Sequence, residues 1–289
     1  MYFMLAISTA AAAGKAVVFK KIGVDSKSTK QLVASNALSF LFAALLTLAF
    51  SGFRFGKLLS ISPFSFLLAV LFAVCMIFTY LTQMKALSFG NGSSTMMVYS
   101  CGFLVPIVFG ALAYNEHISL VQLFALLLLI LSLVLIINPK QSGKLSISWL
   151  VFSFLSALGS GMVAVLQKIH QHSPFAKEYS EVLVWEFIIA AAASAVITNF
   201  FHKNAEKTTV TKKQVFTSSI NGTFLCVLNT MNIQLAGKLP AVIVFPIYNI
   251  GSIVLSGVMC ALLFKETVAN REIFGFAVGC AAMLLIGLF

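Results

Sequence analysis

Two charged side chains stand inside long apolar stretches of the sequence, at Lys15 and Glu186. A charge at the centre of a membrane helix costs about 2.5–3.5 kcal/mol on insertion scales, so such a group usually faces a cavity or a partner. A buried lysine would attract a substrate carboxylate or phosphate, and a buried glutamate would carry a proton or bind a substrate amine. The alternatives are that Lys15 reaches the interface along its own stem and that Glu186, beside Trp185, meets the headgroups.

Amide and hydroxyl groups form a second set of candidates. Asn221, Asn229 and Asn232 are separated by eight and three residues, a spacing that places them on one face of a helix. Thr79 and Thr82 begin a comparable patch in the first half of the chain. Both patches are either interhelical hydrogen bonds or substrate contacts. The candidate substrate-binding residues are Lys15, Thr79, Tyr80, Gln83, Tyr99, Glu186, Asn229, Asn232, Tyr248 and Asn249.

The composition indicates an integral membrane protein. Hydrophobic residues make up 60% of the 289 residues and charged residues 9%, whereas soluble domains carry roughly 25% charged residues. The net charge of +11 comes from basic residues in short loops, which suits anionic lipid headgroups and not nucleic acid. The cysteines lie in apolar runs, and the four histidines are predicted to lie in loops. We therefore expect no metal site, no cofactor and no disulfide framework.

The elements that must position these side chains are predicted to be ten membrane-spanning helices, each near the roughly 20 apolar residues that a crossing requires. The fold class is accordingly all-α. The predicted helices are Tyr2–Phe19, Gln31–Phe50, Phe64–Leu87, Ser93–Tyr114, Leu120–Ile137, Trp149–Ile169, Val182–Phe201, Val215–Leu235, Ala241–Phe264 and Glu272–Phe289.

The two halves of the chain share a pattern. Glu266 lies 150 residues after Glu116 (266 − 116), and Lys168 lies 147 residues after Lys21 (168 − 21), each at a matching predicted helix end. A unit of five helices is odd, so the second unit would enter the membrane from the opposite side, as an inverted repeat. The predicted repeats are residues 1–138 and 146–289. The side away from the termini carries more Lys and Arg in its loops, which favours a cytoplasmic position for that side.

These features resemble the EamA type of the drug/metabolite transporter superfamily, over essentially the whole chain. The resemblance is carried by the ten inverted helices, by Ala86-Leu87 and Leu235-Ala236 closing the third and eighth, and by Glu116 and Glu266 closing the fourth and ninth. It implies a secondary active transporter, not an enzyme, that exports a small polar organic metabolite such as an amino acid. Transport would proceed by alternating access around a central cavity. The resemblance also implies cytoplasmic termini, which the loop charges oppose.

The expected partners are a small-molecule substrate, the lipid bilayer and coupling protons, and the expected state is a monomer or a homodimer. The expected location is the bacterial plasma (inner) membrane, crossed many times. The alternative function is a non-transporting membrane scaffold or subunit that dimerises through its C-terminal helix. Gly275 and Gly279 are spaced for close helix contact there, although packing inside the chain would use them equally well.

Overall fold

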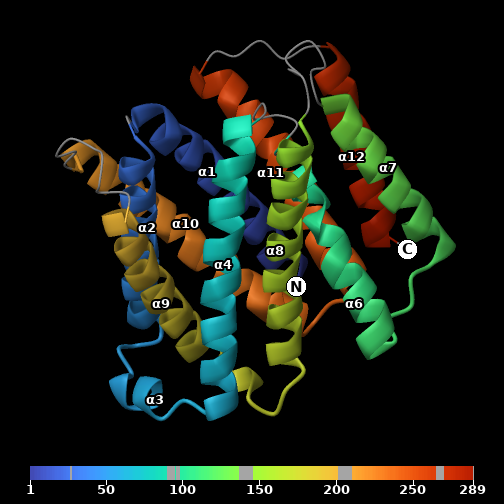
Figure 1. The fold of residues 1–289 in the computed structure, drawn as a ribbon. Helices are drawn as coiled ribbons and strands as arrows, with labels where there is room; N and C mark the ends of the chain where they lie inside the picture. Colours follow the sequence, from blue (N-terminus) through green and yellow to red (C-terminus); the bar gives the residue numbers. More distant parts are fainter. Residues whose placement is uncertain are drawn as a thin grey trace.

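The protein is a bundle of helices, seen in a computed structural model that describes residues 1–26, 28–89, 95, 98–136, 146–200, 210–264 and 270–288 (Figure 1). Two short 3₁₀ turns, η1 (Cys101–Phe103) and η3 (Ala176–Glu178), precede α6 and α9. The helices are α1 (Tyr2–Asp25), α2 (Thr29–Phe50), α3 (Phe55–Leu59), α4 (Pro63–Phe89), α6 (Leu104–Tyr114), α7 (Leu120–Ile136), α8 (Ile147–Gln171), α9 (Tyr179–Phe200), α10 (Lys212–Ala236), α11 (Ala241–Phe264) and α12 (Asn270–Leu288).

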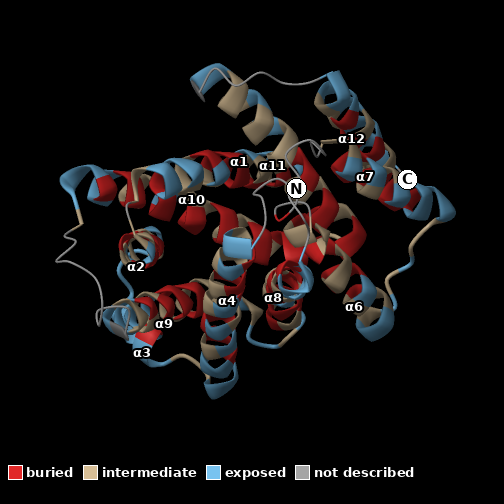
Figure 2. Cartoon of the chain, turned by 45° about the horizontal axis from the view of Figure 1, so that its top comes forward, coloured by how far each residue is buried: buried red, intermediate tan, exposed pale blue. Residues whose placement is uncertain are grey.

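The order of the elements confirms the predicted ten crossings, with η1 and α6 together forming the fourth. Among the described residues, seven helices are long and apolar enough to span a membrane, and the fourth and fifth crossings are shorter apolar helices. The polar helix α10 is in neither group, yet 13 of its 25 residues are buried, and Figure 2 shows it coloured largely as buried. A helix with this many amides and hydroxyls is tolerated because its buried polar face packs against other helices.

The helix bounds differ from the predicted ones most at α1. This helix continues through Lys20 and Lys21 to Asp25, six residues beyond the predicted end at Phe19 (25 − 19). Lys15 therefore lies ten residues from the helix end, or about 15 Å along the axis. A lysine stem does not bridge that distance, so the predicted position of Lys15 near a helix end is wrong.

Some predicted features fall outside the described residues. They are the start of the fourth predicted helix at Ser93, the loop that separates the two predicted repeats, Glu266 and one of the four histidines, His202.

The helices pack in two clusters joined by α1, α8 and α10. One cluster is built from α2, α4 and α9 with α10, and the other from α6, α7, α11 and α12. Small residues let the joining helices approach closely. A Cβ added to Gly161 of α8 would lie 2.6 Å from the Gly102 carbonyl oxygen, and one added to Gly222 of α10 would lie 2.6 Å from that of Ser39. Both glycines therefore fix the spacing of the helices around the centre.

Gly275 and Gly279 of α12 pack against α7 of the same chain. Ser132 of α7 donates its hydroxyl to the Gly275 carbonyl at 2.7 Å, and a Cβ added to Gly279 would lie 2.7 Å from the Ser132 Oγ. Gly275 and Gly279 are buried, so the face that the dimer alternative requires is already covered by α7.

Candidate functional site

A small closed cavity lies where three parts of the chain meet near the middle of the bundle. Its volume of about 20 Å³ is enough for one water molecule. Three predicted site residues, Tyr99, Tyr248 and Asn249, lie on its wall, and sequence reasoning missed a fourth polar group there, Ser160. The complete lining is Tyr99, Gly102, Phe103, Ser160, Gly161, Ala164, Phe245, Tyr248 and Asn249.

The local structure of α11 sets the polar wall of the cavity. Pro246 lies inside this helix and has no N–H to donate. Around it, the Asn249 amide donates to the Phe245 carbonyl at 2.9 Å, and the Tyr248 ring lies edge-on to the Phe245 ring with 6.1 Å between centroids. On the opposite wall, Ser160 lies between two glycines: Gly159 lets α8 approach α4, and Gly161 lets it approach η1. The glycine on each side of Ser160 was the sequence feature that could have pointed to this residue.

Lys15 lies close to this cavity. Tyr248 packs against a cluster that includes Ala11 and Ala12 of α1. Lys15 follows these two residues by three or four positions, about one helical turn or 5 Å along the axis. Its side chain is half-buried, and no ion pair involves it within the described part of the chain. The Lys15 amine thus has no ion-pair partner among the described residues.

The asparagines of α10 face the protein interior. Asn229 donates to the Leu225 carbonyl at 3.0 Å and accepts a hydrogen bond from Gln167 of α8 at 3.3 Å. Ser8 of α1 donates its hydroxyl to Asn232. Both asparagines are buried. In this conformation their side chains form hydrogen bonds that join α10 to α8 and α1.

The predicted patch on α4 is likewise engaged in helix contacts. Thr79 donates to the Cys75 carbonyl at 2.6 Å and packs against Gly159 of α8. The Tyr80 hydroxyl donates to the Leu32 carbonyl of α2 at 3.2 Å. Gln83 is half-buried and has a polar partner. None of these side chains is among the residues that line the cavity.

Glu186 belongs to a different part of the molecule. It is fully buried in α9, in the cluster where Phe40 stacks on Phe187 at 6.4 Å between ring centroids. Contact with the headgroups is therefore excluded in this conformation, and Trp185 alone reaches outward, donating its indole N–H to the Leu58 carbonyl at 3.0 Å.

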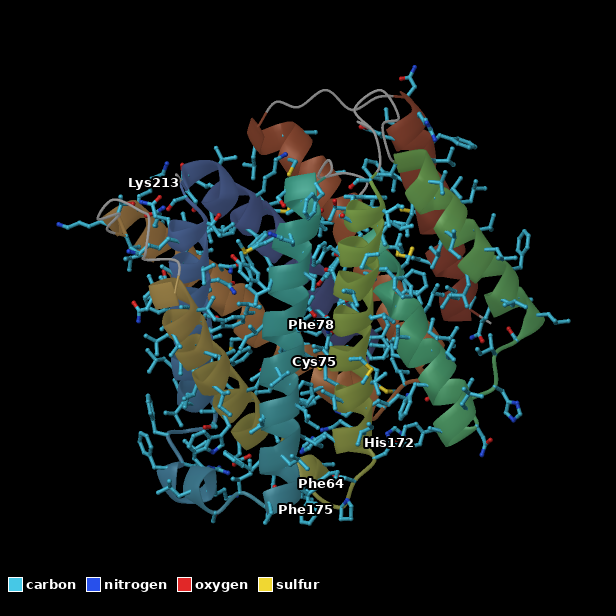
Figure 3. All side chains as sticks on the ribbon, viewed as in Figure 1. Phe64, Cys75, Phe78, His172, Phe175 and Lys213 are labelled. Atoms are coloured by element: carbon cyan, nitrogen blue, oxygen red, sulfur yellow. The ribbon has the colours of Figure 1, made fainter. Side chains whose placement is uncertain are left out.

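A second polar cluster closes one end of the bundle. We call this end side A; it carries α3 and η3 and is the lower end in Figure 1. Figure 3 shows Phe64, Phe175 and His172 there, with Lys213 at the other end, side B. Glu116 accepts the backbone N–H of Ala241 at 2.9 Å and forms an ion pair with buried Lys168. The predicted structural role of Glu116 at a helix end agrees with these contacts.

His170 corrects one prediction about the histidines. It lies in α8 and is buried, with its Nε2 3.4 Å from the Ser65 hydroxyl, because α8 extends two residues beyond its predicted end at Ile169. Among the described residues, no group of three histidine, cysteine or acidic side chains is placed to hold a metal ion.

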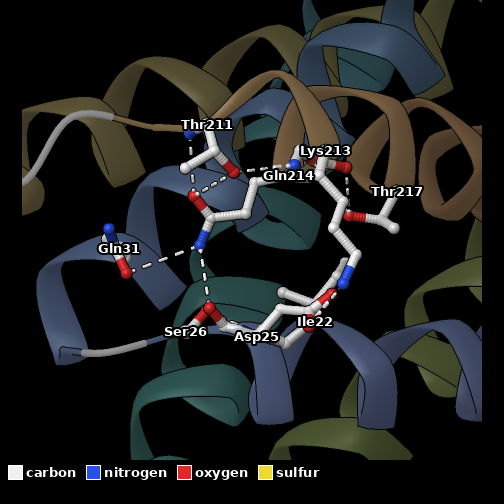
Figure 4. A network of polar contacts seen from close by, with 8 residues as sticks. All are labelled: Ile22, Asp25, Ser26, Gln31, Thr211, Lys213, Gln214 and Thr217. Atoms are coloured by element: carbon white, nitrogen blue, oxygen red, sulfur yellow. Dashed lines mark hydrogen bonds and ion pairs between the residues drawn. The ribbon is translucent and has the colours of Figure 1, made fainter.

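On side B, a network joins the ends of α1, α2 and α10 (Figure 4). Lys213 forms an ion pair with Asp25 at 2.9 Å, and Gln214 contacts Gln31 at 3.5 Å. Thr211 and Gln214 bond reciprocally and cap α10. These contacts fix the end of α10 from which its buried polar face begins.

The fold and site together define a multi-pass helical membrane protein with a small polar cavity enclosed among its helices. Residues 1–138 match the sequence model described as the EamA-like transporter family, which identifies this part of the chain as an EamA-like domain. A protein of known crystal structure is similar in fold over 99% of this chain and 96% of its own, with a TM-score of 0.80 and 14% sequence identity. No curated protein matches the sequence.

Proposed function

We propose that the protein is a secondary active transporter that exports a small polar organic metabolite, such as an amino acid, by alternating access around the central cavity. The observation that carries this proposal is the convergence of Tyr99, Ser160, Tyr248 and Asn249 on one enclosed space. Tyr99 comes from the first half of the chain and the other three from the second. Hydroxyl and amide groups so placed would hydrogen-bond a polar solute, and Lys15, one helical turn beyond the α1 residues that share a cluster with Tyr248, would attract its carboxylate.

The packing of the helices supports the proposed inverted repeat. If α1, α2, α4, α6 and α7 correspond to α8, α9, α10, α11 and α12, the strongest contacts have counterparts, whereas α11 packs on α12 without a comparable contact of α6 with α7 among the described residues. Helix α4 packs on α8 as α10 packs on α1, and α2 packs on α10 as α9 packs on α4. Helices α2 and α9 pack on each other, as do α7 and α12. Two such halves could exchange roles across a twofold axis in the membrane plane, which is the basis of alternating access.

The size of the cavity requires a conformational change. An amino acid does not fit into about 20 Å³, and the aromatic rings of Phe103, Phe245 and Tyr248 occupy the surrounding space. Substrate would enter only when α11 and η1 separate from α8. The closed cavity is thus consistent with a resting or occluded step of the cycle.

Flux measurements in proteoliposomes test this proposal. Purified protein would be reconstituted and screened against amino acids, nucleobases, nucleotide sugars and cationic drugs. We expect at least one solute to exchange across the bilayer, and we expect Tyr248→Phe or Asn249→Leu to reduce that exchange. Absence of flux for every solute, with correctly folded protein, would contradict the proposal.

A non-transporting scaffold or subunit is the second candidate, because Phe103, Phe245 and Tyr248 line a cavity of only about 20 Å³. In that case no solute of the same panel would stabilise the protein. A thermal-shift screen of the purified protein separates the two candidates, since a transported solute would raise the melting temperature and a scaffold would show no response.

A further inference from the structure

Glu186 of α9 is a buried acidic side chain that does not line the central cavity. Its exposed fraction is 0%, and neither carboxyl oxygen has a hydrogen-bond partner among the described residues. The cavity is lined from η1, α8 and α11, whereas α9 packs mainly on α2 and α4. Glu186 thus lies in a separate compartment from the proposed substrate.

The surroundings of Glu186 are almost entirely apolar. The side chains of Phe40, Phe72 and Phe187 are buried in the same cluster. The thiol of Cys75 on α4 lies close enough to Glu186 for an electrostatic interaction, and Cys226 of α10 belongs to the same cluster. Figure 3 labels Cys75 midway along α4.

No basic residue lies near the middle of any helix packed on α9. The charged residues of the packed elements lie at or near helix ends or on the short helices outside the bundle. They are Lys30 of α2, Lys57 of α3, Lys85 of α4, Lys212 and Lys213 of α10, and Lys177 and Glu178 of η3; Glu181 lies in the first turn of α9 itself.

An ionised carboxylate without a hydrogen bond or a counter-ion is not stable in such a site. The free energy lost with its hydration is far larger than the interaction free energy that apolar neighbours provide. The protonated acid is neutral and loses much less. We propose that Glu186 is a proton-binding site, separate from the central cavity, that holds a proton in this closed conformation and releases it when the helices around it separate. The role of this proton in coupling rests on the proposed transport function.

A carbodiimide tests the protonation of Glu186 without a substrate. Dicyclohexylcarbodiimide partitions into the bilayer and reacts with protonated carboxyl groups. The acid O–H adds across one C=N bond, so the proton moves to nitrogen and the carboxyl oxygen bonds to the central carbon. Rearrangement then gives a stable N-acylurea that retains the whole reagent, which mass spectrometry locates on a peptide.

We expect the label on Glu186 in full-length protein reconstituted at neutral pH, and its loss in Glu186→Gln. Glu116 is the matched control, because its carboxylate is paired with Lys168 and accepts the Ala241 N–H. It should remain unmodified, and Glu116→Gln should leave the label on Glu186 unchanged. An unmodified Glu186 in the wild type, or equal labelling of Glu116, would overturn the proposal.

Proton movement tests the coupling. Proteoliposomes holding a pH-sensitive dye would be exposed to a solute that the wild type moves. We expect proton flux to accompany that solute in the wild type and to be lost in Glu186→Gln, while solute exchange at equal pH persists. Proton flux that persists in Glu186→Gln would overturn the coupling role. If no solute moves, the proposed transport function fails, and the labelling still decides whether Glu186 binds a proton.

Discussion

Lys168 near the end of α8 and Glu116 after α6 form a buried ion pair that also secures the start of α11. The Lys168 side chain is 1% exposed and that of Glu116 is 16% exposed. Glu116 additionally accepts the Ala241 N–H, so one carboxylate joins the ends of three helices at side A. The Tyr114 ring lies 5.9 Å from the ammonium and stacks on His172. This arrangement holds the two walls of the cavity together at one end.

Breaking this pair should destabilise the protein. Lys168→Met leaves a buried carboxylate without its counter-ion, which costs about 3–5 kcal/mol of unfolding free energy. Reversible unfolding in mixed micelles would measure the loss. The control is Lys213→Met, because Lys213 is 62% exposed and its pair with Asp25 is worth about 0–1 kcal/mol. Equal losses of unfolding free energy for the two substitutions would show that the Lys168–Glu116 pair stabilises the protein no more than the exposed Lys213–Asp25 pair does.

Gly161→Ala should disturb the cavity wall. The added methyl group would lie 2.6 Å from the Gly102 carbonyl oxygen and 2.5 Å from the Val105 Cβ. Overpacking of this kind costs about 1–3 kcal/mol, and it should also reduce transport by moving Ser160. Gly23→Ala in α1 is the control, since nothing lies within 4 Å of the new Cβ and the helix should gain about 0.5–1 kcal/mol. A melting temperature unchanged by Gly161→Ala would contradict the close approach of α8 and η1.

Lys15→Met should affect substrate transport and not the folding of the protein. The ammonium has no ion-pair partner in the described residues, so its removal should leave the folded yield unchanged and lower the flux of a carboxylate-bearing solute. Flux per folded protein in proteoliposomes measures this, with Lys57→Met in the exposed α3 as the control. Wild-type flux in Lys15→Met would exclude a role for Lys15 in substrate attraction.

The contact between Asn229 and Gln167 should show a small coupling energy. Either single substitution to Ala removes the 3.3 Å hydrogen bond between α10 and α8 and leaves a buried amide unpaired, at a cost of about 1–3 kcal/mol. In a double-mutant cycle the coupling should be about 0.6 kcal/mol, the mean for polar pairs between membrane helices. A coupling of zero would indicate that the two amides do not meet and that Asn229 is free to bind substrate.

Much of the fold was predictable because a membrane helix must satisfy its backbone internally and expose apolar side chains. Long apolar runs therefore gave the crossings, including α11 with its bounds unchanged. The end of α1 was not predictable from apolarity, because Lys20 and Lys21 continue the helix beyond the apolar run. Helix α10 was predicted as one of the ten apolar runs, although among the described helices it is not apolar enough to count as a membrane span by hydropathy.

The candidate site was predictable only in part. Tyr99, Tyr248 and Asn249 do meet, but Asn229 and Thr79 are engaged in contacts between helices. The difference arises from which face of each helix meets which neighbour, and helical spacing within one segment does not contain that information. Ser160, Gln167 and the partner of Lys168 become visible only when helices distant in sequence are placed side by side.

The most direct test of the central claim is solute exchange by wild type and two matched variants in proteoliposomes. Asn249→Leu removes an amide from the cavity wall, whereas Thr223→Val removes a hydroxyl from the exposed face of α10. We predict that the wild type and Thr223→Val exchange a small polar metabolite at similar rates and that Asn249→Leu does not. Equal exchange by all three proteins, or exchange by none, would contradict transport through the cavity between η1, α8 and α11.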